Sequence, residues 1–187
     1  GLVSADGGLA DTAIPRQTKA VVVVEEKDTE SLTQQVAALA AELADELATK
    51  DPDVKVTAKR LADTAETITC AAPEATKRVA AFLQATPNGV QAMSADMPGL
   101  VQTSLNLGIL KADVEVLRAE YSVRSSVESE KDNLIAKLSA LVELTGGDYV
   151  VTGDYPGWKY RVHSPLREKM VKLYAEMYGN EPRVEAI

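Results

Sequence analysis

The stretch that decides the fold runs from Thr86 to Ser126 and reads TPNGVQAMSADMPGLVQTSLNLGILKADVEVLRAEYSVRSS. Its middle alternates between apolar and polar residues with a period of two, which is typical of a strand with one buried face. The residues expected on the apolar face are Val101, Thr103, Leu105, Leu107 and Ile109, and those on the polar face are Gln102, Ser104, Asn106 and Gly108. The pattern predicts a strand over residues 101–109.

A second run with the same alternation follows this strand. Leu117, Ala119, Tyr121 and Val123 alternate with Arg118, Glu120, Ser122 and Arg124. A turn at Lys111 to Asp113 would place the two polar faces on the same side of a β-hairpin. Two interpretations of that side stay open. It is either an ordinary solvent-facing surface or a ligand-binding face with Arg124 at its far end.

The residues before this hairpin predict further elements. The valine-rich segment Ala13 to Glu25 indicates a strand in a central, twice-covered position. Leucines at helical spacing predict a helix from Thr29 to Thr49, with Ser31 and Gln34 forming a capping box. A short strand is expected from Asp53 to Thr57.

A helix is expected to open at Pro73, because proline is favoured in the first turn. After the hairpin, a helix capped by Ser129 and Asp132 is expected to end at Gly146, followed by a strand from Asp148 to Thr152. This order predicts an α+β fold, a ferredoxin-like antiparallel sheet with helices on one face.

The remaining segments are a linker and a tail. Lys59 to Ala72 leans towards helix, without a clear period. Gly153 to Pro165 is rich in proline, glycine and aromatic residues and predicts a loop. Ser164 is expected to cap a helix that ends at Gly179, and a final strand is expected to begin before Ile187.

Composition excludes several classes of function. The formal net charge is −8, and no basic run is longer than two residues, which disfavours nucleic-acid binding. The longest apolar run, Ala20 to Val24, is far short of the roughly 20 residues of a membrane span, so no membrane association is expected. One cysteine, Cys70, rules out an intrachain disulfide and fits the cytoplasm. With His163 as the single histidine, the chain lacks the ligands of a conventional zinc site.

Six short motifs occur in the order of a known enzyme family. They are AIPR at 13–16, TPNGV at 86–90, TSLNLG at 103–108, SVRSSVES at 122–129, YPGW at 155–158 and SPL at 164–166. Together they resemble the aminoacyl-histidine dipeptidases, also called Xaa-His dipeptidases or bacterial carnosinases, which are cytosolic zinc metallopeptidases. The likeness extends over nearly the whole chain.

The resemblance implies a division of the chain. Residues 1–153 correspond to a lid domain for substrate binding and dimerisation that lacks its first strand and helix, and residues 154–187 to a loop, a helix and the start of a strand that returns to the catalytic domain. The resemblance also implies that, in the parent enzyme, paired zinc ions (or cobalt or manganese) polarise the scissile carbonyl and activate water, with a glutamate as general base. This chain carries none of those metal ligands or catalytic residues, so we expect it to be inactive alone. Because the family's lid contributes to dimer contacts, the resemblance also implies a homodimer.

Two residues of the chain match substrate-binding positions of the family. Arg124 corresponds to the arginine that holds the C-terminal carboxylate of the dipeptide, a role that suits the planar guanidinium fork. The alternative for Arg124 is a salt bridge to Glu120 or Glu128. Thr12 stands where the family has asparagine, and its shorter side chain lacks the amide donors. For Asn106, a structural hydrogen bond is favoured over a ligand contact.

The sequence therefore predicts part of a zinc-dependent dipeptidase that hydrolyses Xaa-His dipeptides. A stand-alone α+β module for ligand binding or dimerisation is the first alternative. The second is the lid of a related metallopeptidase that acts on another peptide.

Overall fold

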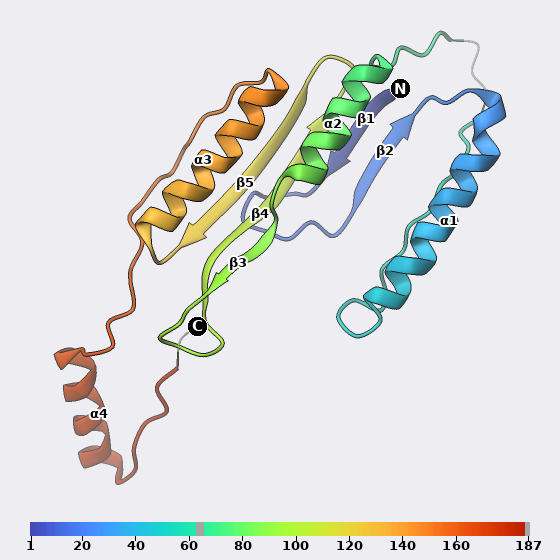
Figure 1. The fold of residues 1–187 in the computed structure, drawn as a ribbon. Helices are drawn as coiled ribbons and strands as arrows, with labels where there is room; N and C mark the ends of the chain where they lie inside the picture. The colour runs from blue at the N-terminus through green and yellow to red at the C-terminus, as the bar shows by residue number, and fades with distance from the viewer. Residues whose placement is uncertain (63–65, 186–187) are drawn as a thin grey trace.

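A long antiparallel hairpin of β4 (Val101–Ala112) and β5 (Leu117–Ser125) forms the middle of the computed structural model, which describes residues 1–62 and 66–185 (Figure 1). The predicted hairpin is confirmed, but its turn spans residues 113–116 rather than 111–113. The Asp113 carboxylate fixes this turn, since its Oδ1 accepts hydrogen bonds from the amides of Glu115 (2.8 Å) and Val116 (2.9 Å).

The other strands join β4 on the edge opposite β5. β1 (Leu2–Gly7) pairs with the carboxyl-terminal half of β4, and β3 (Gly89–Met93) pairs with its amino-terminal half. β2 (Thr18–Val22) pairs with β1, and every pairing is antiparallel. The predicted α+β fold with an antiparallel sheet is confirmed.

β2 differs from the prediction made for the valine-rich segment. The segment was expected to be a central strand over residues 13–25, but only Thr18–Val22 forms a strand, and it lies at the edge of the sheet beside β1. Val22, Val23 and Val24 remain 46%, 37% and 41% exposed. An apolar run predicts burial, but within the described residues no second strand covers this edge.

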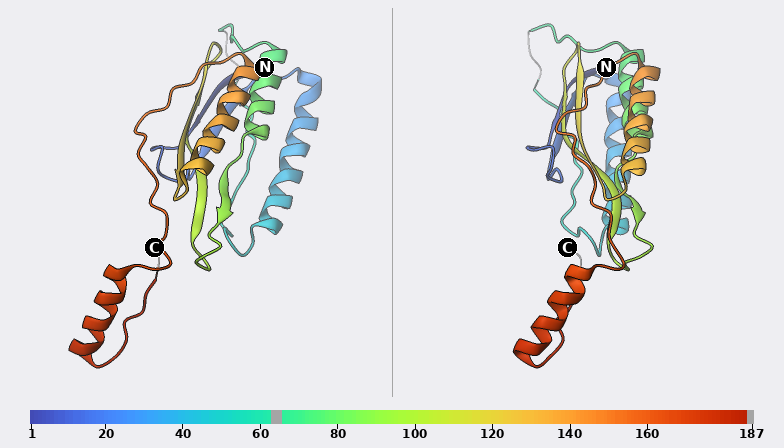
Figure 2. Two further views of the ribbon diagram at one scale, coloured as in Figure 1. Left: turned by 60° about the vertical axis from the view of Figure 1, so that its left-hand side comes forward. Right: turned by 90° about the vertical axis from the view of Figure 1, so that its left-hand side faces the viewer.

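Helices α2 (Pro73–Ala85) and α3 (Glu128–Thr145) pack against one face of the sheet, as predicted (Figure 2). The core lies between these helices and the sheet. Its buried apolar residues are Leu2, Ala5, Phe82, Leu105, Leu110 and Leu134. The opposite side of the sheet, called the open face below, carries no helix (Figure 2).

A β-bulge at Gly108 changes the phase of β4. Leu107 pairs with Tyr121, whereas Ile109 pairs with Glu120, so β4 carries one extra residue at this point. Side chains alternate between faces, and the extra residue therefore turns Ile109 to the open face and Leu110 into the core. The prediction that Ile109 shares a face with Leu105 is wrong.

Two of the predicted helix caps are also wrong. α1 (Thr29–Glu46) begins after the short 3-10 helix η1 (Glu26–Asp28), so Ser31 lies inside its first turn rather than at the cap. Likewise, α3 begins at Glu128, which places Ser129 and Asp132 inside the helix. The end of α3 at Gly146 is confirmed, because this residue adopts a φ of 75°.

Two predicted strands do not form. Asp53–Thr57 and Asp148–Thr152 run as irregular chain, since neither lies beside a strand that could supply ladder hydrogen bonds in the described structure. Of the segment 59–72, residues 63–65 lie outside the described residues, and the rest is not helical.

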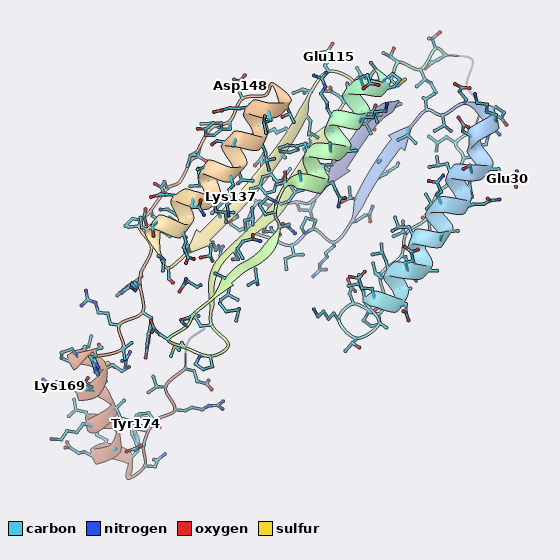
Figure 3. All side chains as sticks on the ribbon, viewed as in Figure 1. Glu30, Glu115, Lys137, Asp148, Lys169 and Tyr174 are labelled. Atoms are coloured by element: carbon cyan, nitrogen blue, oxygen red, sulfur yellow. The ribbon has the colours of Figure 1, made fainter. Side chains whose placement is uncertain are left out.

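The tail stands away from the sheet. α4 (Pro165–Tyr178) is capped by Ser164, whose Oγ accepts a hydrogen bond from the amide of Arg167 (3.3 Å), as predicted. Figure 3 shows its side chains, Lys169 and Tyr174 among them, remote from both layers of the sheet domain. Residues 180–185 form no strand, and the end of the predicted final strand, 186–187, lies outside the described residues.

Candidate functional site

Arg124 lies on the open face of the sheet. It is the direct cross-strand partner of Ser104, and Ser122 is the partner of Asn106. Directly opposed residues share a face. Ser104 and Asn106 alternate with the buried Thr103 and Leu105, so these four side chains point away from α2 and α3. The predicted coincidence of the two polar faces is confirmed for this half of the hairpin.

The guanidinium of Arg124 is exposed and carries no partner within the described residues. Both carboxylates considered as its salt-bridge partners are engaged elsewhere. Glu120 pairs with Arg118 (2.9 Å) and Glu128 with Lys131 (2.7 Å). The alternative of a sheet-end salt bridge is therefore not realised, and the fork of Arg124 is available to an external carboxylate.

Thr12 lies in the loop of residues 8–17 that joins β1 to β2, called the β1–β2 loop below. Asn106 holds this loop over the open face. Its Nδ2 donates hydrogen bonds to the carbonyl oxygens of Asp11 (3.1 Å) and Ala13 (2.8 Å), one on each side of Thr12. The predicted structural role of Asn106 is confirmed, and Thr12 itself is exposed.

Two glycines allow the β1–β2 loop to lie directly against β4. A Cβ on Gly108 would meet the carbonyl oxygen of Asp11 at 2.2 Å, and one on Gly8 would meet the carbonyl oxygen of Gly108 at 1.8 Å. Gly8 also has a φ of 80°, a conformation that favours glycine. The loop therefore crosses β4 at the bulge, next to Asn106.

A polar network fixes the end of β5 beside Arg124. The carboxylate of Glu130, in α3, accepts hydrogen bonds from Gln102 Nε2 (2.8 Å) and from Thr103 Oγ1, and Thr103 in turn lies 2.8 Å from Ser125 Oγ. The hydrogen bond from Thr103, followed by that from Gln102, holds the pKa of Glu130 below its usual value. The sequence patterns did not predict this network. The only indication of this network in the sequence was Thr103, the one polar residue on the predicted apolar face.

Lys131 anchors the linker that follows α3. It is only 5% exposed, and its Nζ donates to Asp154 Oδ1 (2.6 Å) and to the carbonyl oxygen of Tyr155 (2.8 Å) besides pairing with Glu128. Asp154 first, and then Glu128, raise the pKa of Lys131. The linker is thereby tied to the start of α3.

The second oxygen of Glu128 extends the same anchor. It accepts a hydrogen bond from the amide of Gly157 (3.0 Å). Gly157 in turn lies so close to the end of β5 that a Cβ on it would meet the Ser125 carbonyl oxygen at 2.6 Å. The sequence offers the i, i+3 spacing of Glu128 and Lys131 as a signal, but nothing points to Asp154.

Metal ligands are not gathered in the described residues. Residues 1–62 and 66–185 contain no group of three or more His, Cys, Asp or Glu side chains that could hold a metal ion. Cys70 lies next to Gly1, before α2, whereas His163 is exposed before α4. In the same ranges no helix has the length and apolar character needed to cross a bilayer.

Comparison with known proteins identifies relatives of the whole chain. No protein-family model matches it. The cytosol non-specific dipeptidase of Escherichia coli (strain K12) is 28% identical over 186 residues, which is 100% of this chain. The crystal structure of aminoacylhistidine dipeptidase from Vibrio alginolyticus superposes on 97% of the chain with a TM-score of 0.88 and 29% identity. The chain is a homologue of these dipeptidases. The resemblance found in the sequence motifs is thus confirmed.

The dipeptidase relatives are longer than this chain. It spans 38% of the length of the Escherichia coli protein and 36% of the Vibrio alginolyticus chain. The chain that carries the open face, Arg124 and Thr12 therefore corresponds to little more than a third of the length of either dipeptidase.

Proposed function

We propose that the chain is the lid portion of a zinc-dependent aminoacyl-histidine dipeptidase, and that its open face binds the dipeptide. The observation that carries the proposal is the unpaired guanidinium of Arg124 on that face, across from Ser104. A dipeptide has a C-terminal carboxylate, which an arginine fork binds with two parallel hydrogen bonds. Thr12 contributes a hydroxyl to the same ligand.

The large exposed surface supports a role within a bigger assembly. The accessible surface is 14512 Å² for 20.0 kDa, whereas a compact monomer of this mass exposes about 8,700 Å². Apolar side chains contribute to the excess, with Leu9 99%, Ile14 83% and Trp158 88% exposed. Leu9 and Ile14 belong to the β1–β2 loop, which places apolar surface beside the proposed dipeptide site.

We propose the division into residues 1–153 as the lid and residues 154–187 as the return to a catalytic domain. The position of α4 supports it, because this helix stands apart from the sheet and leaves Leu166, Met170 and Met177 more than half exposed (Figure 1). Tyr155 and Trp158 are likewise exposed, as expected for residues that pack between the two parts only in the complete enzyme.

The hydrolytic chemistry is assigned to parts of the enzyme outside this chain. The described residues do not gather the ligands for zinc, cobalt or manganese, so we assign the metal site to the catalytic domain of the parent enzyme. What this chain supplies is binding and orientation of the substrate. We place the enzyme in the cytoplasm, in keeping with the name of the cytosol dipeptidase from Escherichia coli.

A homodimer through the β2 edge is the second part of the proposal. β2 offers an unpaired strand edge in the described structure, and Val22 to Val24 beside it are exposed. α1 lies beyond this edge (Figure 1) and has no buried residue, although its apolar residues recur at helical spacing. An uncovered edge next to an uncovered apolar stripe fits a second copy of the same chain.

The experiment is an assay of the complete enzyme with zinc, cobalt or manganese. Release of histidine from carnosine and other Xaa-His dipeptides, with little hydrolysis of dipeptides that lack C-terminal histidine, is the expected result. Equal rates on both groups would favour a broad dipeptidase, the alternative suggested by the name of the Escherichia coli relative. Absence of hydrolysis of every dipeptide would overturn the proposal in favour of a stand-alone binding module.

A further inference from the structure

Asn106 lies between the two residues proposed to contact the ligand, Arg124 and Thr12. It lies two residues from Ser104 along β4, and Ser104 is the cross-strand partner of Arg124. Asn106 and Arg124 are therefore diagonal neighbours on the open face, a separation of roughly 7–8 Å between backbones. No other side-chain hydrogen bond in the described structure joins the β1–β2 loop to β4.

The two donors of the Asn106 amide are both used on the loop backbone. They reach the carbonyl oxygens of Asp11 and Ala13, so the backbone is held before and after Thr12 while the Thr12 side chain stays exposed. An amide that contacted a ligand would need a free donor. Asn106 has no free donor, which excludes direct ligand binding through its nitrogen and indicates that it acts on the loop.

Contacts next to Asn106 also fix where the β1–β2 loop lies on β4. Gly108 and Gly8 permit the close approach only because they lack a Cβ. On the other side of Asn106, the amide of Leu107 donates a hydrogen bond to Asn88 Oδ1 (2.9 Å). Leu107 lies in the part of β4 between the residues that pair with β3 and those that pair with β1, so this side chain takes the place of a strand partner there. The backbone of β4 on either side of the Asn106 side chain is thus held as well.

We propose that Asn106 is a positioning residue, which holds the β1–β2 loop so that Thr12 meets the same ligand as Arg124. This inference rests on the proposed function. It adds to that function a residue that touches no substrate but determines whether Thr12 can reach it.

The test uses Asn106→Asp in the complete enzyme, with Ser122→Ala as the matched control. Asn106→Asp keeps the size of the side chain but faces two carbonyl oxygens with an oxygen instead of N–H donors. Ser122 lies opposite Asn106 on the same face and makes no side-chain hydrogen bond in the described structure. Asn106→Ala, which adds no charge, serves if the aspartate variant fails to fold.

The first readout is hydrogen exchange of peptides that cover residues 9–17. It does not depend on activity. We expect roughly tenfold faster exchange in Asn106→Asp and no change in Ser122→Ala, because the loop loses both bonds to β4. Gly108→Ala, which displaces the same loop by steric contact with Asp11, is expected to give a similar acceleration. Unchanged exchange in Asn106→Asp would overturn the inference.

The second readout is a double-mutant cycle on the KM for the dipeptide. Thr12→Ala is expected to raise KM several-fold in the wild-type background and to have no further effect in Asn106→Asp, because the loop is already displaced. An equal effect of Thr12→Ala in both backgrounds would overturn the positioning role alone. If Thr12→Ala and Arg124→Ala both left kcat/KM unchanged, the proposed function itself would fail. The exchange data would still report whether Asn106 holds the loop, so the two claims can fail separately.

Discussion

Arg124 in β5 stands directly across from Ser104 in β4, on the face of the sheet that the helices leave open. This pairing depends on the bulge at Gly108. With the turn at residues 113–116 and a regular ladder, Arg124 would instead be the cross-strand partner of Leu105. The extra residue in β4 shifts the register by one, so that Ser104 and Asn106, rather than Leu105 and Leu107, share the open face with Arg124.

Loss of the Arg124 guanidinium is expected to impair the complete enzyme strongly. Arg124→Ala should lower transition-state stabilisation by about 2–5 kcal/mol, since the substrate carboxylate would be left without its charged partner. Arg124→Lys should recover only part of it, because an ammonium cannot bind both carboxylate oxygens in parallel. The measurement is kcat/KM on a Xaa-His dipeptide. Arg118→Ala, on the same strand and face but paired with Glu120, is the control, and an equal loss in both variants would refute a specific role for Arg124.

The anchor at Lys131 is expected to hold the linker in place. Lys131→Met keeps most of the apolar stem but leaves the Glu128 and Asp154 carboxylates facing each other without their shared cation. Exchange of the Gly157 amide, which donates to Glu128, should become at least about tenfold faster, and the melting temperature should fall. Lys137→Met, an exposed lysine on the same helix, should change neither quantity. Identical behaviour of the two variants would show that the linker is held by other contacts.

The stability of the chain is expected to fall in acid through Glu130. The pKa of Glu130 is lower in the folded state than its ordinary value of 4.5, so the unfolded chain binds more protons as the pH drops below that value. Stability is therefore fully present above about pH 4.5 and is lost as the pH falls through the folded pKa. Urea unfolding of wild type and Glu130→Gln between about pH 3 and 7 tests this. The variant should show a shallower acid-side loss, whereas Glu143→Gln on the exposed side of α3 should follow the wild type. Parallel curves for all three proteins would contradict the prediction.

Association through the β2 edge and α1 is expected to depend on the apolar stripe of that helix. Leu39 is 46% exposed and lies on a helix without buried residues, so Leu39→Glu should leave the fold intact while placing a charge in the proposed interface. Light scattering should report a dimer for the wild type and a monomer for the variant. Ala41→Glu carries the same charge about 200° around the helix and should remain dimeric. A wild-type monomer at high concentration would refute the dimer.

Local patterns in the sequence were sufficient for much of the fold. Alternation over 101–107 and 117–124 predicted the hairpin, leucine spacing predicted α1, and Pro73 and Gly146 marked one start and one end correctly. These features depend on side-chain period and on backbone preferences of single residues, which the sequence carries directly. The motifs that resemble dipeptidases were likewise readable, and they singled out Arg124 and Thr12.

Which polar residues contact each other was decided only by the tertiary structure. The bulge at Gly108 arises where the β1–β2 loop, almost a hundred residues away in sequence, crosses β4 without room for a Cβ. The bonds of Lys131 to Asp154 and Tyr155 and the two bonds of Asn106 are also long-range contacts, and the place of β2 at the edge depends on the order of the whole sheet. Sequence periodicity reports which face of a strand or helix a residue occupies, but it carries no information about which distant segment covers that face.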